Sequence, residues 1–564
     1  SACATAQRVG VPPASRPSAR GVEEGLLCST AAFSPWTGRW RGDNAAMTLH
    51  AVVARRATAW TLTLAAVLSL PAQAQGQSQT LPAPVLQALA KARIPASSLA
   101  VAALPLHNDA VPWGWQPARV MQPGSSMKLV TSIVALDRLG PNHRGFTELK
   151  TAAPLVAGTL QGDLALVGGG DVELGLPQMW ALMLELQHAG VRHINGNLLL
   201  DRTRYRPARP DQGVPPFDSA PEFPYNVIPD ALHLAGSLLP LELRATATGV
   251  EASTVPRLPG VSFDSSMALV DGRCQDWDDH WKPVAVARKD AAVSVTLNGA
   301  FPRNCIVRAE LQLLDRTELA ERLFRHIWLG LGGTWSGQAV EQAAPAGARV
   351  LARRNGRPWG ELLRQLNKQS DNAWTRVLYL ELGAARSAAE PGRQTAELAA
   401  QTVREWFAEQ GISSEGLVMD NGSGLSRSER ISPQQMAQLL VAASRGRHAA
   451  DFAMSLPTVG VDGTMRNRIK ESPATGWARF KTGTLRNVVA LAGYVTDPQG
   501  RPWAVSMMIN DEEGASRGRP VLDALVDFIA RVGFPQPALV GVGEIAAGGF
   551  GPGADSLSLL VQRK

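Results

Sequence analysis

The chain has 564 residues, which is too many for one ordinary domain, so we expect two to four domains. Hydrophobic residues make up 45% of the chain and charged residues 19%, a composition typical of a globular protein with ample material for a core. The formal charge is +7 without any block of Lys and Arg, which argues against a nucleic-acid partner.

The N-terminal part has the pattern of a secretory signal that starts at Met47. Arg55 and Arg56 supply a basic start, 57–70 is apolar, and Ala72-Gln73-Ala74 is a small-residue cleavage pattern. The apolar stretch of about 14 residues is short of the roughly 20 that span a bilayer. We therefore expect a signal peptide at 47–74, cleaved after Ala74, rather than a retained anchor. We expect residues 1–46 to be a non-native or upstream extension.

The mature part alternates between helical and strand patterns. Helical spacing predicts helices at 82–94, 125–139, 174–189, 358–383, 397–410 and 520–532. Apolar runs bounded by turns predict strands at 99–106, 291–297, 477–482, 488–496 and 503–509, and 207–224 is a proline-rich loop. We interpret 75–146 plus 346–535 as one domain of helices and antiparallel strands. A mostly-β region at 147–345 is inserted into it, and 536–564 is a tail.

Export changes the interpretation of the cysteines. Cys3 and Cys28 lie in the discarded part, so the mature chain keeps Cys274 and Cys305. In an oxidising compartment such a pair is a disulfide candidate, and two unpaired thiols are the alternative. Two cysteines and scattered histidines offer too few ligands for a zinc site, so we expect no metal and no cofactor. After the signal, no stretch is long and apolar enough to span a membrane, which predicts a periplasmic protein.

Three short motifs follow one another along the chain. They are Ser125-Ser126-Met127-Lys128, then Ser370-Asp371-Asn372, then Lys481-Thr482-Gly483. This ordered set is the signature of class A β-lactamases and penicillin-binding proteins. Ser125 begins the chain's one S-x-x-K and Lys481 its one K-T-G, and each stands in a fitting context: a helix start after Pro-Gly, and a strand that leads into a hairpin.

The spacing has a chemical reason. Three positions apart on a helix, Ser125 and Lys128 share one face, so the lysine can act as the base that an unaided serine hydroxyl needs. A lysine does so only when its pKa is lowered, which burial and a second cation such as Lys481 both achieve. Ser370 and Asn372 are expected to hold Lys128 and relay its proton. Backbone N–H groups at the helix start and at Thr484 would stabilise an oxyanion.

Further short segments of the sequence carry a family resemblance. These sequence boxes are 123–131, 162–164 with 168–171, 420–427 and 456–466. They resemble the penicillin-binding protein 4 type D-alanyl-D-alanine carboxypeptidase/endopeptidases of peptidase family S13, over roughly 80–535. The first box departs slightly, because Gly124 stands where the family usually has Ala. The 241 residues between Lys128 and Ser370 match the insertion that the resemblance implies, in which one mostly-β domain carries another nested within it.

The resemblance implies both fold and activity. The fold would be a serine β-lactamase/penicillin-binding-protein-like transpeptidase domain of the α+β class. The activity would be cleavage of peptidoglycan stem peptides through an acyl-enzyme on Ser125, with β-lactams as inhibitors. Lys481, Thr482, Gly483 and Thr484 would bind the terminal carboxylate end of the substrate, and Asn372 its amide. Arg427, Arg466 and Arg486 are candidates for a substrate carboxylate or are surface arginines.

Two other functions are less consistent with these motifs. A class A β-lactamase needs a Glu-x-x-Leu-Asn pattern between the second and third motifs, and none occurs between Asn372 and Lys481. A non-catalytic penicillin-binding sensor would have lost catalytic positions, whereas all of them are present. The sequence does not separate carboxypeptidase from endopeptidase preference.

Overall fold

The computed structural model describes residues 80–107 and 110–534. The expected extension at 1–46, the signal peptide at 47–74 and the tail at 536–564 therefore lie outside the described residues. None of the helices within the described part has the length and apolarity that a membrane crossing needs.

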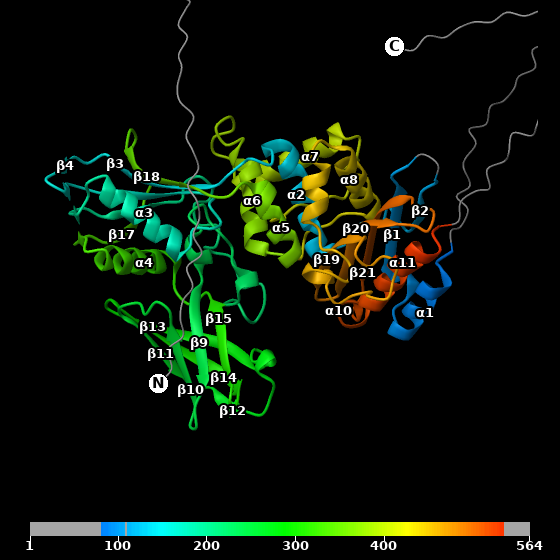
Figure 1. Cartoon of the computed structure of the whole chain (residues 1–564), viewed down its shortest axis with the longest axis horizontal. Coiled ribbons are helices and arrows are strands. Elements are labelled where there is room, and N and C mark those ends of the chain that lie inside the picture. The colour runs from blue at the N-terminus through cyan, green and yellow to red at the C-terminus, as the bar shows by residue number, and fades with distance from the viewer. Residues whose placement is uncertain (1–79, 108–109, 535–564) are drawn as a thin grey trace, which may run out of the picture. The chain divides into compact units, whose positions relative to one another are not determined.

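The residues before and after the insertion carry the three motifs, and together they form the catalytic part. A five-stranded sheet is the centre of this part (Figure 1). Its order is β19-β20-β21-β1-β2, and all neighbouring pairs are antiparallel. The strands are β1 (Leu99–Pro105), β2 (Trp113–Trp115), β19 (Arg479–Leu485), β20 (Val488–Thr496) and β21 (Pro502–Asn510). The predicted strands at 99–106, 477–482, 488–496 and 503–509 are confirmed to within three residues. The strand β19, which carries the third motif, lies at the edge of the sheet, and at its start Arg479 forms an isolated bridge with Thr458.

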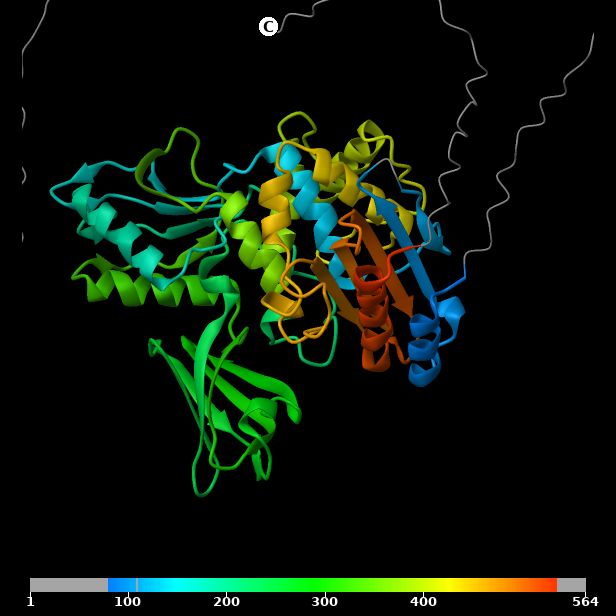
Figure 2. The same cartoon turned by 45° about the vertical axis from the view of Figure 1, so that its right-hand side comes forward.

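Helices cover both faces of this sheet, as Figure 2 shows. One face is covered by α1 (Ala83–Ala92) and α11 (Arg519–Arg531), and the short helix α10 (Gly514–Arg517) precedes α11. The other face is covered by a layer of six helices: α2 (Lys128–Leu139), α5 (Trp359–Gln369), α6 (Asn372–Ala384), α7 (Thr395–Glu409), α8 (Pro433–Arg445) and α9 (Ala449–Ser455). Along β21, Trp503 and Val505 pack toward α11, whereas Ala504 and Met508 pack toward α8. Burial on both faces explains the near-continuous apolar strands. The expected α+β class, with helices on both sides of an antiparallel sheet, is confirmed.

The inserted region starts and ends at one point of the catalytic part. The backbone N–H of Gly356 donates to the carbonyl of Gly145 over 2.9 Å. Between them a five-stranded sheet has the order β17-β8-β6-β3-β18, built from β3 (Phe146–Thr151), β6 (Leu164–Gly169), β8 (Leu198–Asp201), β17 (Ala339–Glu341) and β18 (Arg349–Asn355). Since β18 lies beyond the predicted boundary at 345, we propose a boundary after Asn355.

Two helices accompany this sheet, so the part of the insertion that contains it is a mixture of helices and strands. They are α3 (Leu176–His188) and α4 (Arg316–Gly330). A small second sheet has the order β16-β7-β5-β4, built from β4 (Leu155–Val156), β5 (Thr159–Leu160), β7 (His193–Ile194) and β16 (Thr334–Trp335). Leucine and methionine side chains from α3 and aromatic side chains from α4 pack in one core with the strands.

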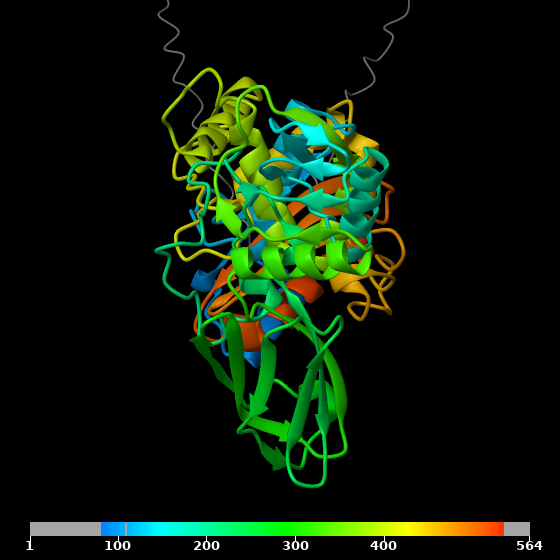
Figure 3. The ribbon, with the colours of Figure 1, turned by 90° about the vertical axis from the view of Figure 1, so that its left-hand side faces the viewer.

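A second, all-β unit is nested within the insertion (green in Figure 3). One sheet has the order β10-β9-β15, and another contains β11, β14, β12 and β13. The strands are β9 (Leu239–Ala245), β10 (Val250–Thr254), β11 (Val261–Ser265), β12 (Ala268–Val270), β13 (Trp281–Lys289), β14 (Ala292–Pro302) and β15 (Ile306–Leu311). A disulfide joins Cys274 and Cys305 across 31 positions, the pairing that the sequence offered as a candidate.

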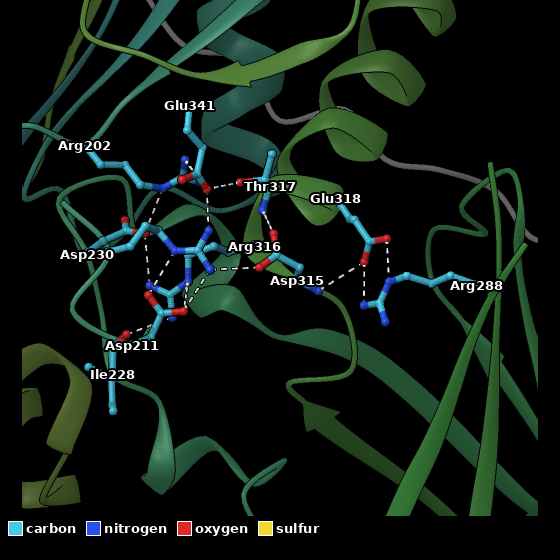
Figure 4. Close-up of polar contacts among 11 residues, drawn as sticks. Arg202, Asp211, Ile228, Asp230, Arg288, Asp315, Arg316, Thr317, Glu318 and Glu341 are labelled. Carbon is cyan, nitrogen blue, oxygen red and sulfur yellow. Dashed lines mark hydrogen bonds and ion pairs between the residues drawn. The ribbon is translucent and has the colours of Figure 1, made fainter. Parts of the chain in front are cut away.

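A buried ionic cluster holds the chain around residues 228–230, which follows the cleft-lining Tyr225 within the insertion (Figure 4). The Asp230 carboxylate is 1% exposed and accepts hydrogen bonds from Arg202 over 2.8 Å and Arg316 over 3.0 Å. Arg316, the first residue of α4, also donates to the carbonyl of Ile228 over 2.8 Å. A buried carboxylate shared by two guanidinium groups is costly to separate, so the chain around 228–230 is firmly placed.

Candidate active site

The nucleophile stands in a tight turn against the edge strand. Ser125 belongs to a 3-10 turn, Gly124–Met127, that runs directly into α2. Gly124 has φ +53°, and a Cβ there would lie 3.1 Å from the backbone nitrogen of Thr484. On the strand, a Cβ at Gly483 would lie only 2.4 Å from the carbonyl oxygen of Pro123. The two glycines thus let the turn approach the backbone of β19, which brings the first and third motifs together.

Lys128 lies directly beneath the nucleophile. Its side chain is fully buried, and Nζ donates to Ser125 Oγ over 3.1 Å, to Asn372 Oδ1 over 2.6 Å and to the carbonyl of Ser423. Burial lowers the pKa of Lys128 to about 7, although the carboxylates of Asp371 and Glu429 act in the opposite direction. A lysine with that pKa is partly neutral near neutral pH, so it can accept the serine proton.

The second motif occupies the break between α5 and α6. Ser370 ends α5 with φ +62°, a left-handed conformation that is uncommon for a residue with a side chain. The Asp371 carboxylate then accepts the N–H of Trp374 over 2.8 Å, an N-cap that begins α6 at Asn372. The pattern of one long helix over 358–383 is thus interrupted where Ser370 and Asn372 face the cleft.

Lys481 forms a second lysine–serine pair. Its Nζ donates to Ser370 Oγ over 2.7 Å and to the carbonyl of Thr482 over 2.8 Å. Burial and the nearby charge of Lys128 hold the pKa of Lys481 well below its usual value. The structure therefore divides the expected contacts: Asn372 holds Lys128, whereas Ser370 is bonded to Lys481.

A cleft of about 700 Å³ opens above these groups. Residues of the first two motifs line it, together with residues of the proline-rich loop and the 425–427 and 484–487 segments: Gln122, Ser125, Phe217, Asp218, Ser219, Tyr225, Ser370, Asn372, Leu425, Arg427, Thr484, Leu485, Arg486 and Asn487. The third motif lies just before the 484–487 segment; there Thr482 Oγ1 bonds Thr464 Oγ1 over 2.9 Å, and Thr484 is exposed. Arg427 donates to the carbonyl of Phe217, whereas Arg466 is exposed and does not line the cleft.

One wall of the cleft comes from the insertion. The Asn372 side-chain amide donates to the carbonyl of Tyr225 over 2.9 Å, and the Tyr225 hydroxyl donates to Asp218 over 2.9 Å. Arg376 of α6 donates to the carbonyl of Val227 over 2.9 Å. Sequence reasoning missed this wall, because the 207–224 loop has no periodicity that marks a functional residue.

Comparison with known proteins gives one consistent family. The sequence pattern of the D-Ala-D-Ala carboxypeptidase 3 (S13) family matches residues 81–532. A D-alanyl-D-alanine carboxypeptidase of Actinomadura sp. (strain R39) is 30% identical over 411 residues, which are 70% of this chain and 74% of that protein. D-alanyl-D-alanine carboxypeptidase DacB of Haemophilus influenzae is 24% identical over 69% of this chain and 80% of its own length.

Solved structures give the same fold. The crystal structure of penicillin binding protein 4 from Haemophilus influenzae superposes with a TM-score of 0.66 at 23% identity. The match covers 78% of this chain and 97% of that protein. The same protein has been solved in complex with a β-lactam, and that structure superposes with a TM-score of 0.63.

Proposed function

The chain belongs to the D-Ala-D-Ala carboxypeptidase 3 (S13) family, and we propose that Ser125 and Lys128 carry its reaction, cleavage of the terminal D-Ala from peptidoglycan stem peptides. One observation carries the assignment: a fully buried lysine with a pKa of about 7 lies 3.1 Å from the hydroxyl of a serine that lines an open cleft. Such a pair meets the geometric and protonation requirements of nucleophilic catalysis.

Acylation follows from this geometry. Ser125 Oγ attacks the carbonyl carbon between the two D-Ala residues, while neutral Lys128 takes the hydroxyl proton. The N–H groups of Ser125 and Thr484 would hold the oxyanion, a role supported by the approach of the nucleophile turn to β19. When the C–N bond breaks, Ser370 delivers a proton to the leaving amine, which departs as D-Ala. Lys481 is bonded to Ser370 and can replenish that proton.

The carboxylate end of the substrate fits the edge strand. Lys481, Thr482, Gly483 and Thr484 lie in sequence on β19 at the edge of the sheet, and Thr484 lines the cleft. Asn372 would hold the substrate amide with the N–H that remains after its bond to Tyr225. Water then hydrolyses the ester on Ser125 and restores the free enzyme. A β-lactam presents the same carbonyl and carboxylate, so it acylates Ser125 and is released slowly.

The direct test is product analysis with the mature protein, residues 75–564. A stem pentapeptide should lose one D-Ala, and a fluorescent penicillin should label Ser125 stoichiometrically. Ser125→Ala should show neither reaction. Rapid turnover of the penicillin would instead favour a β-lactamase, and labelling without any peptide cleavage would favour a sensor. A cross-linked muropeptide dimer in parallel reports endopeptidase activity.

We also propose that the mature protein works in the periplasm. Support comes from the signal pattern at 47–74 and from the disulfide between Cys274 and Cys305, a bond that persists in oxidising compartments. Expression of the chain from Met47 followed by N-terminal sequencing of the periplasmic fraction should yield Gln75 as the first residue. An uncleaved product retained in the membrane would contradict the proposal.

A further inference from the structure

A buried carboxylate organises the loop that lies against Lys128. Glu429 is completely buried and accepts four backbone N–H groups of the loop 420–424. Its Oε1 accepts from residues 420, 421 and 422 over 3.3, 3.1 and 2.7 Å, and its Oε2 accepts from Gly424 over 2.8 Å. Gly422 and Gly424 have φ of +71° and +83°, which turns successive N–H groups toward one anion.

The opposite side of the same loop faces α2. The carbonyl of Ser423 accepts from Lys128 Nζ, and the carbonyl of Gly422 accepts from Thr131 Oγ1 over 2.8 Å. The Ser423 carbonyl and the Gly424 N–H belong to a single peptide group. That peptide group therefore connects the Lys128 ammonium on one side with the Glu429 carboxylate on the other.

Titratable groups interact with Glu429 from three directions. Lys128 lies on α2, Arg376 and Tyr379 lie on α6, and Asp420 lies on the loop itself. Burial and the charge of Asp420 raise the pKa of Glu429, whereas the backbone N–H groups lower it. All of the hydrogen-bond partners of its carboxyl group are donors, so the ionised carboxylate fits the site.

Lys128 in turn faces charged groups on several elements. Asp371 and Glu429 raise its pKa and Arg376 lowers it, while the charge of Lys128 in turn lowers the pKa of Lys481. The buried carboxylate of Glu429 thus partly offsets the desolvation that makes Lys128 a base.

We propose that Glu429 is a positioning residue for the acylation step: it fixes the Ser423–Gly424 peptide against Lys128 and supplies this lysine with a buried negative charge. The inference rests on the proposed role of Lys128 as the base. Glu429 itself does not touch the substrate, because it lies behind the loop and does not line the cleft.

Replacement of Glu429 by Gln removes the negative charge of the side chain and keeps its shape. The amide has nearly the same volume, but its NH2 group must face a backbone N–H, so at least one loop contact is lost. We expect the second-order rate of Ser125 acylation by a chromogenic β-lactam to fall about 10- to 100-fold, the scale of a misplaced catalytic group. Loss of the negative charge also lowers the pKa of Lys128, so the midpoint of the pH–rate profile should move to lower pH.

Replacement of Glu429 by Asp tests the other half of the role. The charge stays but the carboxylate is one methylene short, so the acylation rate should fall while the pH midpoint stays where it is in the wild type. This variant also serves if Glu429→Gln does not fold.

Glu381→Gln is a matched control. Glu381 is also a fully buried carboxylate, but it binds Arg204, Tyr205 and His143, which lie outside the cleft. This variant should melt at a lower temperature and keep both the acylation rate of the folded protein and its pH midpoint.

The outcomes separate this inference from the proposed function. If wild-type protein is not acylated and releases no D-Ala, the function is wrong. If the wild type reacts while folded Glu429→Gln keeps both rate and midpoint, the function stands and the positioning role is wrong. An unchanged acylation rate in Glu429→Asp, or a midpoint shift in Glu381→Gln as large as in Glu429→Gln, would equally overturn it.

Discussion

The two walls of the cleft are built in opposite ways. The wall that carries Ser125 belongs to the catalytic part, and the two lysines behind it, Lys128 and Lys481, are fully buried. The wall of Phe217, Asp218 and Tyr225 comes from an irregular loop of the insertion, and Tyr225 is 42% exposed. The first wall is held by side chains that bond one another, whereas the second is tied to the catalytic part through backbone carbonyls.

This difference separates chemistry from recognition. Groups that must hold unusual protonation states need a dry, rigid setting, which only the packed core offers. A wall that meets the rest of the substrate can be exposed, because it contributes contacts and not proton transfer. Changes in the first wall should therefore reduce kcat, and changes in the second should mainly affect KM.

The largest expected effect is the loss of the base. Lys128→Met preserves length and apolar volume but removes the proton acceptor, so kcat for D-Ala release should fall by about 10⁴–10⁶. Lys150→Met, on β3 of the insertion, is the control and should leave kcat unchanged. A Lys128→Met enzyme within tenfold of the wild-type kcat would show that another group accepts the proton.

The pH profile is the next largest effect. Acylation requires neutral Lys128, whose pKa of about 7 leaves roughly 1% neutral at pH 5 and about half at pH 7. The acylation rate should thus rise about 50-fold between pH 5 and pH 7 and level off above pH 8. Stopped-flow acylation with a chromogenic β-lactam measures this directly, and a flat profile over that range would contradict the assignment of the base.

A smaller effect is expected when the insertion wall is loosened. Arg376→Met keeps the buried volume of a 7% exposed side chain but removes the donor to the Val227 carbonyl. We expect kcat/KM for the pentapeptide at pH 8 and above to fall about tenfold, mostly through KM, since one charged hydrogen bond is worth about 1.5–3 kcal/mol. Because Arg376 lowers the pKa of Lys128, the pH midpoint of acylation should also move to higher pH. Arg468→Met, which breaks an ion pair with Asp523 of α11, should leave KM unchanged. A fall confined to kcat would mean that Arg376 serves the first wall instead.

The smallest effect on catalysis should come from the disulfide. Cys274→Ser with Cys305→Ser opens a 31-residue loop and should destabilise the nested β unit by roughly 3–4 kcal/mol in the chain-entropy model. Acylation of Ser125 should stay within twofold of the wild type, because neither cysteine lines the cleft. Thermal unfolding and acylation measured on the same preparation would separate the two effects, and parallel losses would show that the cleft depends on the stability of the nested β unit.

Local patterns in the sequence predicted much of the catalytic part. The helix at 125–139 and the strand at 488–496 have clear periodicity. Hydrogen bonds of Lys128 and Lys481 bring residues of the three motifs together. The strand β18 pairs with β3 of the insertion, although it lies beyond the predicted boundary at 345. Its Arg-rich sequence looks exposed, and its partner β3 lies about 200 positions earlier, so no local signal reveals the pairing.

The missed parts of the site share a physical cause. Tyr225 and Ser423 contribute backbone carbonyls, and a carbonyl is the same in every residue, so the sequence does not mark it. Glu429 acts on backbone N–H groups and likewise leaves no pattern. The importance of Gly124 is visible only once Thr484, about 360 positions later, is known to lie against it.

The hydrogen bond between Gly356 and Gly145 has an evolutionary consequence. Because the chain leaves and re-enters the catalytic part at adjacent points, the insertion of some 210 residues interrupts that part at one place. An ancestral hydrolase with the bare serine–lysine core could therefore acquire a new wall for its substrate in one event, without a change in the residues that perform the chemistry. The range of substrates can then change through the insertion while the residues that perform the chemistry stay the same.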